Sequence, residues 1–251
     1  MRLWRAHGLG NDYLVLHEAG GVVLTPHLVR ELCHRHTGVG SDGILEPIPG
    51  RDGADFGLRI HNPDGTEAEK SGNGLRIYSA WLVGERGAPN SFQVWTAGGV
   101  VACHVRGGWV RVNMGPPRTW GPEQLAGHHA YRVDIGNPHA VVFGVPIEWR
   151  KVGAQVCAAV PGGTNVQFVR VENGAPHALI WERGAGETMS SGSSACAVAT
   201  VCVQRGMCTS PVDVHMVGGV LRITVGETVE MEGPVEFVGV VQVAAGWLAS
   251  R

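Results

Sequence analysis

The chain has 251 residues, a formal net charge of -2 and a hydrophobic content of 44%. This composition is typical of a folded protein with one large or two modest domains, and it argues against disorder. The scattered charges include no basic run of the kind that binds nucleic acid. No apolar segment reaches the length of a membrane span, and the N-terminal residues lack the apolar stretch of a signal peptide. We therefore expect a cytoplasmic protein that binds neither membrane nor nucleic acid.

Short β-branched runs broken by Gly and Pro predict strands along most of the chain, with a few helices between them. A Thr25-Pro26 start and two Ser-Gly steps mark the clearest helix beginnings. In chain order we expect strands at 12–18 and 56–62, with a helix at 25–36 between them, a helix at 73–84, strands at 92–105, 109–114, 131–136 and 139–145, a helix at 148–158, strands at 165–172 and 177–183, a helix at 193–205, and strands at 221–227 and 235–243.

The two Ser-Gly steps belong to an internal repeat. The segments "EAEKSGNGLR" (67–76) and "ETMSSGSSAC" (187–196) each place Glu and then Ser-Gly before a predicted helix. Upstream, "GNDYLVL" resembles "GNPHAVVF", so three landmarks recur in the same order. They are Asn11, Asn62 and Ser71 in the first half, and Asn137, Glu182 and Ser191 in the second.

This repeat predicts two similar halves with a boundary near residues 113–122, where "NMGPPRTWGPE" breaks the pattern. We expect domains at 1–114 and 115–237, and equivalent halves commonly pack about a pseudo-two-fold axis. Both Ser-Gly turns would then face one cleft. Because a helix N-terminus offers free N–H groups and a partial positive charge, the expected ligand is a small anion or zwitterion.

No metal site is expected from the sequence. Six cysteines are present, and none forms a C-x-x-C pair. The cluster "CHRH" at 33–36 lacks a second Cys/His pair at zinc spacing. Buried free thiols are therefore the interpretation that we favour.

Six segments in register resemble the diaminopimelate epimerase family over nearly the whole chain. They are "HGLGNDY" (7–13), "RHTGVGSDG" (35–43), "RIHNPDGTEAEKSGNGLR" (59–76), "DIGNPHAVVF" (134–143), "GGTNVQFV" (162–169) and "ERGAGETMSSGSSACA" (182–197). The resemblance implies an α/β fold of the α+β type, with two similar domains that each wrap a barrel-like sheet around a central helix. It also implies that the C-terminal strand, within 238–251, returns to the first domain.

The function implied by this resemblance is that of an isomerase in lysine biosynthesis, nominally one that converts LL- to meso-diaminopimelate. The family uses neither pyridoxal phosphate nor a metal, so no cofactor is expected, and it often forms homodimers. The implied catalytic positions are Ser71, Ser191, His139 and Glu182. The positions implied to hold an amino-acid or dicarboxylate-like substrate are Asn11, Asn62, Gly72, Asn73, Asn137, Asn165, Arg183, Gly192 and Ser193. Arg183 matches the arginine that meets the distal carboxylate.

One departure from the family pattern changes the expected chemistry. The family has cysteines where this chain has Ser71 and Ser191. A thiol has a pKa of about 8.5 and an alcohol ionises more like water, at about 15.7. The difference of about 7 units corresponds to roughly 9–10 kcal/mol. We therefore expect altered or weak chemistry from two unaided hydroxyls.

Three alternatives stay open at this level. His139 could take the proton of a serine, as in other activated hydroxyl nucleophiles. Phenazine-biosynthesis isomerases resemble this chain without the cysteine pair, so a carboxylate, first of all Asp42, could instead move the proton. Finally, both serines could simply cap helices, which would leave a non-catalytic binder of amino-acid-like ligands.

Overall fold

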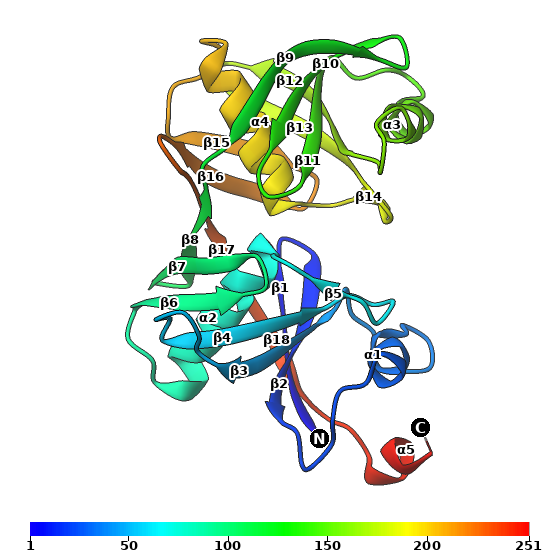
Figure 1. Cartoon of the computed structure of the whole chain (residues 1–251), viewed down its shortest axis with the longest axis vertical. Helices are drawn as coiled ribbons and strands as arrows, with labels where there is room; N and C mark the ends of the chain where they lie inside the picture. Colours follow the sequence, from blue (N-terminus) through cyan, green and yellow to red (C-terminus); the bar gives the residue numbers. More distant parts are fainter. Residues whose placement is uncertain (251) are drawn as a thin grey trace. The chain divides into compact units, whose positions relative to one another are not determined.

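A computed structural model describes residues 1–250 as a mixed α/β chain of two units (Figure 1). Unit 1 comprises Met1–Val112 and the C-terminal segment from Pro234, and unit 2 comprises Asn113–Gly233. Among residues 1–250, no helix is long and apolar enough to cross a membrane. That each unit corresponds to one epimerase-like domain stays a prediction.

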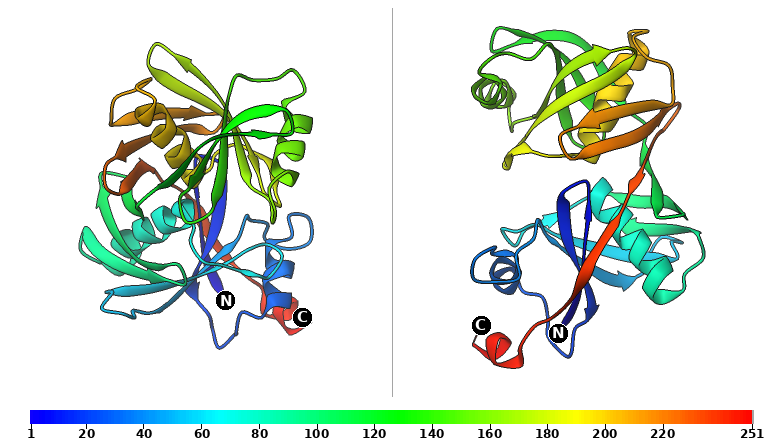
Figure 2. Two further views of the ribbon diagram at one scale, coloured as in Figure 1. Left: turned by 45° about the horizontal axis from the view of Figure 1, so that its top comes forward. Right: turned by 180° about the vertical axis from the view of Figure 1, so that it is seen from behind.

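Unit 1 contains one long helix, two shorter helices and a sheet with mixed strand directions. Its elements are β1 (Arg2–Gly8), β2 (Asn11–Glu18), α1 (Pro26–Cys33), β3 (Ile44–Pro49), β4 (Phe56–His61), β5 (Glu67–Ala68), α2 (Gly72–Arg86), β6 (Ser91–Thr96), β7 (Gly99–Arg106), β8 (Trp109–Gly115), which runs on into unit 2, β18 (Glu236–Gln242) and α5 (Ala245–Ala249). The sheet order is β18-β1-β2-β3-β4-β6-β7-β8. The C-terminal strand β18 therefore lies beside β1 in unit 1 (Figure 2).

Unit 2 repeats this arrangement with its own strands. Its elements are β9 (Arg118–Leu125), β10 (His128–Asp134), β11 (Pro138–Phe143), α3 (Trp149–Ala158), β12 (Asn165–Glu172), β13 (Ala175–Glu182), β14 (Gly186–Thr188), α4 (Gly192–Gln204), β15 (Val212–Met216), β16 (Gly219–Val225) and β17 (Val229–Pro234). The sheet order is β9-β10-β11-β12-β13-β15-β16-β17. Two pairings in each unit are parallel. They are β2–β3 and β4–β6 in unit 1, and β11–β12 and β13–β15 in unit 2.

Alternation along β2 separates two environments within unit 1. Leu14 and Leu16 lie in the apolar cluster formed with α1, whereas Asn11 and His17 bond side chains of α2. Successive side chains of a strand point to opposite faces, so this split follows directly from the sequence spacing. The polar face of β2 is therefore directed at the long helix.

The two long helices are the most enclosed elements of their units. In α4, every residue from Ser194 to Cys202 is buried, and the helix contacts β10 to β13, β15 and β16. The helix α2 buries Tyr78 and Trp81 and contacts β1, β2 and β7. A helix that is apolar on all sides is typical of a fully surrounded position.

The four expected helices are confirmed, with small shifts at their ends. Seven strands and the short helix α5 were not expected, and the strands are β1, β3, β5, β9, β14, β15 and β17. The segment 113–122 was expected to break the pattern, yet much of it belongs to β8 and β9. Pro122 is tolerated in β9 because this strand pairs with β10 alone, as a sheet edge.

Gly43 leaves room for the Tyr13 ring and the His61 carbonyl group, which both pack against its Cα. Its φ is +156°, and an added Cβ would lie 2.5 Å from the His61 carbonyl oxygen and 2.7 Å from Tyr13 Cε1. A backbone oxygen cannot move away as a flexible side chain can, so a larger residue at 43 forces a shift of the strand or of the ring.

We expect Gly43→Ala to lower the free energy of unfolding by about 1–3 kcal/mol, the usual cost of overpacking. The matched control is Gly84→Ala in the exposed last turns of α2, where an added Cβ meets nothing within 4 Å. That control should raise stability by about 0.5–1 kcal/mol, since alanine restricts the unfolded chain. Urea denaturation of both variants measures the difference, and equal effects would contradict the packing argument.

Candidate active site

In unit 1, Ser71 is the residue immediately before the first turn of α2. Its backbone is extended, and its Oγ accepts a hydrogen bond from the Gly74 N–H at 3.0 Å. The hydroxyls of Ser71 and Tyr13 share a second hydrogen bond of 3.2 Å. Ser71 is therefore a genuine N-cap, and it also has a buried phenol as a neighbour.

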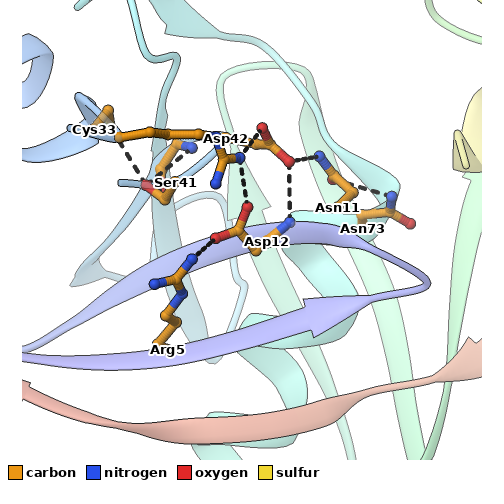
Figure 3. Close-up of polar contacts among 9 residues, drawn as sticks. Arg5, Asn11, Asp12, Cys33, Ser41, Asp42 and Asn73 are labelled. Atoms are coloured by element: carbon orange, nitrogen blue, oxygen red, sulfur yellow. Dashed lines mark hydrogen bonds and ion pairs between the residues drawn. The ribbon is translucent and has the colours of Figure 1, made fainter. Parts of the chain in front are cut away.

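A chain of polar side chains connects the start of α2 with β2 and the loop after α1 (Figure 3). Asn73 Nδ2 donates to Asn11 Oδ1 at 3.0 Å, and Asn11 Nδ2 donates to Asp42 Oδ2 at 2.9 Å. The buried guanidinium of Arg76 donates to Asn73 Oδ1 and, at 2.8 Å, to the Pro234 carbonyl oxygen. Because each amide is held by both its oxygen and its nitrogen, Asn11 and Asn73 are fixed before any ligand arrives.

Asp42 is the acidic end of this chain and is bonded from several sides. Its carboxylate accepts hydrogen bonds from Asn11 Nδ2, from the Asp12 N–H at 3.1 Å and from Arg35 at 2.7 Å. Arg35 also bonds Asp12, which in turn accepts from Arg5 at 2.7 Å (Figure 3). Through these bonds Asp42 orients Asn11. Its role as a proton carrier stays a prediction.

In unit 2, Ser191 precedes α4 in the same extended conformation but makes no capping bond through its side chain. The residue is only 5% exposed, and among residues 1–250 no protein group bonds its hydroxyl. Its neighbour Ser193 accepts a hydrogen bond from Asn137 Nδ2 at 3.4 Å. Helix capping therefore accounts for Ser71 but leaves Ser191 without a structural reason.

His139 was predicted as a base for a serine, and the structure does not support that role. Its Nε2 bonds Asn137 Oδ1 at 2.8 Å, and its Nδ1 bonds Gln167 Nε2 at 3.0 Å. Complete burial, together with the positive charge of Arg183, lowers the pKa of His139 to about 3. The ring is therefore neutral and a weak base, and both of its nitrogens are engaged away from Ser191.

Gln167 completes the polar cluster beneath α4. Its Nε2 donates to His139 and, at 2.9 Å, to Ser194 Oγ. The residue is fully buried, and in the described part of the chain its Oε1 has no hydrogen-bond partner. With Asn137 accepting at Nε2, the imidazole carries its proton there and accepts from Gln167 at Nδ1. This arrangement orients Asn137 toward Ser193.

The same contact recurs in both units at equivalent positions. A strand-end asparagine bonds the residue two after the serine, which is Asn11 with Asn73 in unit 1 and Asn137 with Ser193 in unit 2. Two residues beyond each asparagine stand Tyr13 and His139. The repeat in the sequence therefore corresponds to a repeated contact at the helix start.

The remaining predicted residues lie in turns and at the ends of strands and helices. Asn62 Nδ2 bonds Thr66 Oγ1 at 3.0 Å within the β4–β5 turn. Asn165 Oδ1 accepts from the Arg183 N–H at 2.9 Å, and Asn165 Nδ2 bonds the Pro138 carbonyl oxygen at 3.2 Å. The exposed Arg183 guanidinium donates to the Gly162 carbonyl oxygen at 3.1 Å. Glu182, at the end of β13, is half-buried, and Gly72 and Gly192 form the first residues of α2 and α4.

Three buried cysteines, Cys103, Cys196 and Cys202, are poorly suited to replace the thiols of the family. Burial raises the pKa of Cys103 to about 11 and that of Cys202 to about 12. Cys196 is fully buried inside α4. Thiols that ionise only above pH 10 are poor bases near neutrality. Among residues 1–250, no three His, Cys, Asp or Glu side chains are grouped so that they could hold a metal ion.

Tyr13 and Gln167 are among the residues of these clusters that were missed in the sequence. The alignment of "GNDY" with "GNPH" pairs Tyr13 with His139 and so could have indicated Tyr13. Gln167 had no such signal, because a glutamine inside a strand is unremarkable until its neighbours are known.

Solved structures with the same fold include a predicted epimerase and a probable racemase. A predicted epimerase from Pseudomonas aeruginosa has a TM-score of 0.76 at 20% identity, covering 96% of this chain and 98% of that one. A probable proline racemase from Agrobacterium radiobacter K84, with bound carbonate, has a TM-score of 0.79 at 16% identity, covering 97% and 93%. These likenesses establish the fold of this chain.

The sequence comparisons specify the family. The diaminopimelate epimerase family model matches residues 3–120 and 131–238. A protein from Nostoc sp. named diaminopimelate epimerase 2 is 38% identical over 256 residues, which cover 90% of this chain and 88% of the relative. This chain belongs to the diaminopimelate epimerase family. The resemblance noted in the sequence is confirmed, and the chain is an isomerase of this type.

The difference between the two serines gives a stability test. We expect Ser71→Ala to lower the free energy of unfolding by about 1 kcal/mol, because it removes the N-cap bond to Gly74. Ser191→Ala removes no protein hydrogen bond that the structure describes, so its effect should be about 0.5 kcal/mol or less. Thermal and urea unfolding of the pair measure this. Equal losses would show that Ser191 is also a cap.

The buried His139 makes stability depend on acid. Its folded-state pKa of about 3 lies below the unfolded value of about 6.5. Its stabilising contribution is therefore complete above pH 6.5 and is lost as the pH falls toward 3. Between pH 6.5 and 4 this loss amounts to about 3 kcal/mol.

We expect His139→Asn to show a shallower fall of unfolding free energy over pH 6.5–4 than the unchanged chain, by up to this amount. Urea titrations at several pH values give both slopes. The control is His36→Asn, which replaces an exposed histidine after α1 and should leave the slope unaltered. Identical slopes for the unchanged chain and His139→Asn would contradict a neutral buried ring.

Proposed function

We propose that this chain epimerises a diamino dicarboxylic acid, nominally LL- to meso-diaminopimelate, with Ser71 and Ser191 at the two proton-transfer positions. The observation that carries the proposal is the repeated contact at the start of α2 and α4, where an oriented asparagine bonds the residue two positions after the serine. Such a helix start favours a carboxylate. Relatives named diaminopimelate epimerase support the choice of substrate.

The binding residues support this choice better than the residues at the proton-transfer positions. Asn11 and Asn73 are held in fixed orientations and keep a second N–H each for a ligand. In unit 2, Asn137 and Ser193 play the same part beside α4, and Asn165 holds the Arg183 N–H. We assign Arg183 to a distal carboxylate, because a guanidinium binds carboxylates through paired N–H groups. A substrate with an amino acid at each end suits this set.

The chemistry should be slow compared with that of a thiol pair. A hydroxyl is harder to deprotonate than a thiol by about 7 pKa units, or roughly 9–10 kcal/mol. General acid–base catalysis contributes about 10²- to 10⁴-fold and does not make up that difference by itself. The proposal therefore includes a weak epimerase activity. It also includes a role in lysine biosynthesis, a cytoplasmic location and a homodimer as the active form.

Exchange of the substrate Cα proton with solvent tests the proposal. Incubated with LL-diaminopimelate in D₂O, the unchanged chain should incorporate deuterium slowly, as followed by ¹H NMR and mass spectrometry. Ser71→Cys combined with Ser191→Cys should raise the rate at least about 100-fold. The matched control combines Ser79→Cys with Ser194→Cys, at other buried serines of the same helices, and should not raise the rate.

Two outcomes would redirect the assignment. If neither the unchanged chain nor the double-cysteine variant promotes exchange while both bind the ligand, the chain is a binder and not an epimerase. If exchange in the unchanged chain disappears with Asp42→Asn yet survives Ser71→Ala, the carboxylate rather than a serine moves the proton.

A further inference from the structure

The Tyr13 hydroxyl sits against the serine that begins α2. The side chain comes from β2, on the face that is directed at the helix, and Tyr13 is only 7% exposed. Its Oη lies 3.2 Å from Ser71 Oγ. Gly43 leaves room for the ring, since any Cβ there would collide with Tyr13 Cε1. The Tyr13 phenol therefore occupies a buried, closely packed position next to Ser71.

The hydrogen bonds of Ser71 allow its own proton to point at Tyr13. The Gly74 N–H occupies one lone pair of Ser71 Oγ. A hydroxyl has two lone pairs and one proton, so Ser71 can donate to Tyr13 and still keep one lone pair. That remaining lone pair can accept a proton from a substrate.

The Tyr13 phenol also provides a group that ionises more easily than the Ser71 hydroxyl. A tyrosine has a pKa of about 10 and is thus easier to ionise than an alcohol by nearly 6 units. Its reference value lies within about 2 units of that of a free thiol. The positive end of the helix further favours a negative charge next to Ser71.

We propose that Tyr13 is the proton acceptor behind Ser71, so that the pair Ser71–Tyr13 replaces a single thiol on this side of the substrate. This inference rests on the proposed function. Tyr13 first loses its phenolic proton to water. The substrate Cα–H bond then breaks and its proton forms a new O–H bond with Ser71, while the former Ser71 proton moves to the Tyr13 phenolate. The electron pair of the broken bond stays on the substrate.

Unit 2 provides no equivalent pair. His139 takes the place of Tyr13 there, but its nitrogens bond Asn137 and Gln167, and no protein group in the described chain bonds the Ser191 hydroxyl. The Ser71 side is thus better equipped than the Ser191 side to remove and return a proton. The inference therefore predicts that deuterium enters the substrate faster than the stereocentre inverts.

Four proteins test this inference: the unchanged chain, Tyr13→Phe, Ser71→Cys, and Ser71→Cys with Tyr13→Phe. In the serine background, Tyr13→Phe should slow deuterium exchange at least about 100-fold. Once a thiol occupies position 71, the same change should cost less than about threefold, because the thiol needs no relay. Tyr78→Phe is the matched control, since it removes another buried phenol, bonded to the Gly57 carbonyl oxygen. It should leave exchange within about twofold.

The outcomes separate this inference from the proposed function. Equal losses on Tyr13→Phe in both backgrounds would assign Tyr13 a structural role and overturn the relay. Exchange by the unchanged chain that survives Tyr13→Phe would also overturn it, as would exchange found only in the cysteine variants, although both results leave the epimerase assignment standing. No exchange in any variant, the double-cysteine protein included, overturns the proposed function itself. Urea unfolding of Tyr13→Phe confirms that the compared proteins are folded.

Discussion

The contact between a strand-end asparagine and the first turn of a helix organises each unit of this protein. Asn11 with Asn73, and Asn137 with Ser193, tie the start of a long helix to a neighbouring strand. Helix starts carry N–H groups that the helix itself cannot satisfy. Holding an amide beside those groups produces a fixed set of donors that suits a carboxylate. The rest of each polar cluster orients that amide.

The two units reach this result with different supporting residues. In unit 1 a chain of ion pairs through Asp42 and Arg35 fixes Asn11. In unit 2 a neutral histidine and Gln167 fix Asn137, and the burial that makes them rigid also removes the basicity of His139. Ionised groups suit the first cluster because Asp42 and Arg35 remain partly in contact with solvent. The repeated asparagine is thus oriented by charged groups in unit 1 and by neutral groups in unit 2.

The two serines likewise differ in what holds them. Ser71 is fixed by a backbone N–H and a phenol, whereas Ser191 has neither partner. An N-cap is worth about 1 kcal/mol, which is enough to explain a serine at position 71 on stability alone. No such term applies to position 191. Helix capping therefore explains a serine at position 71 but not at position 191.

The sequence by itself determined the family, the four main helices, the internal repeat and the positions of both serines, since all of these depend on local patterns of Gly, Asn and Ser and on apolar spacing. Strands β1, β3, β5, β9, β14, β15 and β17 escaped it because strand formation depends on cross-strand and same-face packing more than on local sequence preference. Only the tertiary structure decided that His139 bonds Gln167 and that Tyr13 meets Ser71. Those contacts depend on which strand faces surround each helix, and hydrogen-bond partners and burial, which set basicity, exist only once the chain has folded.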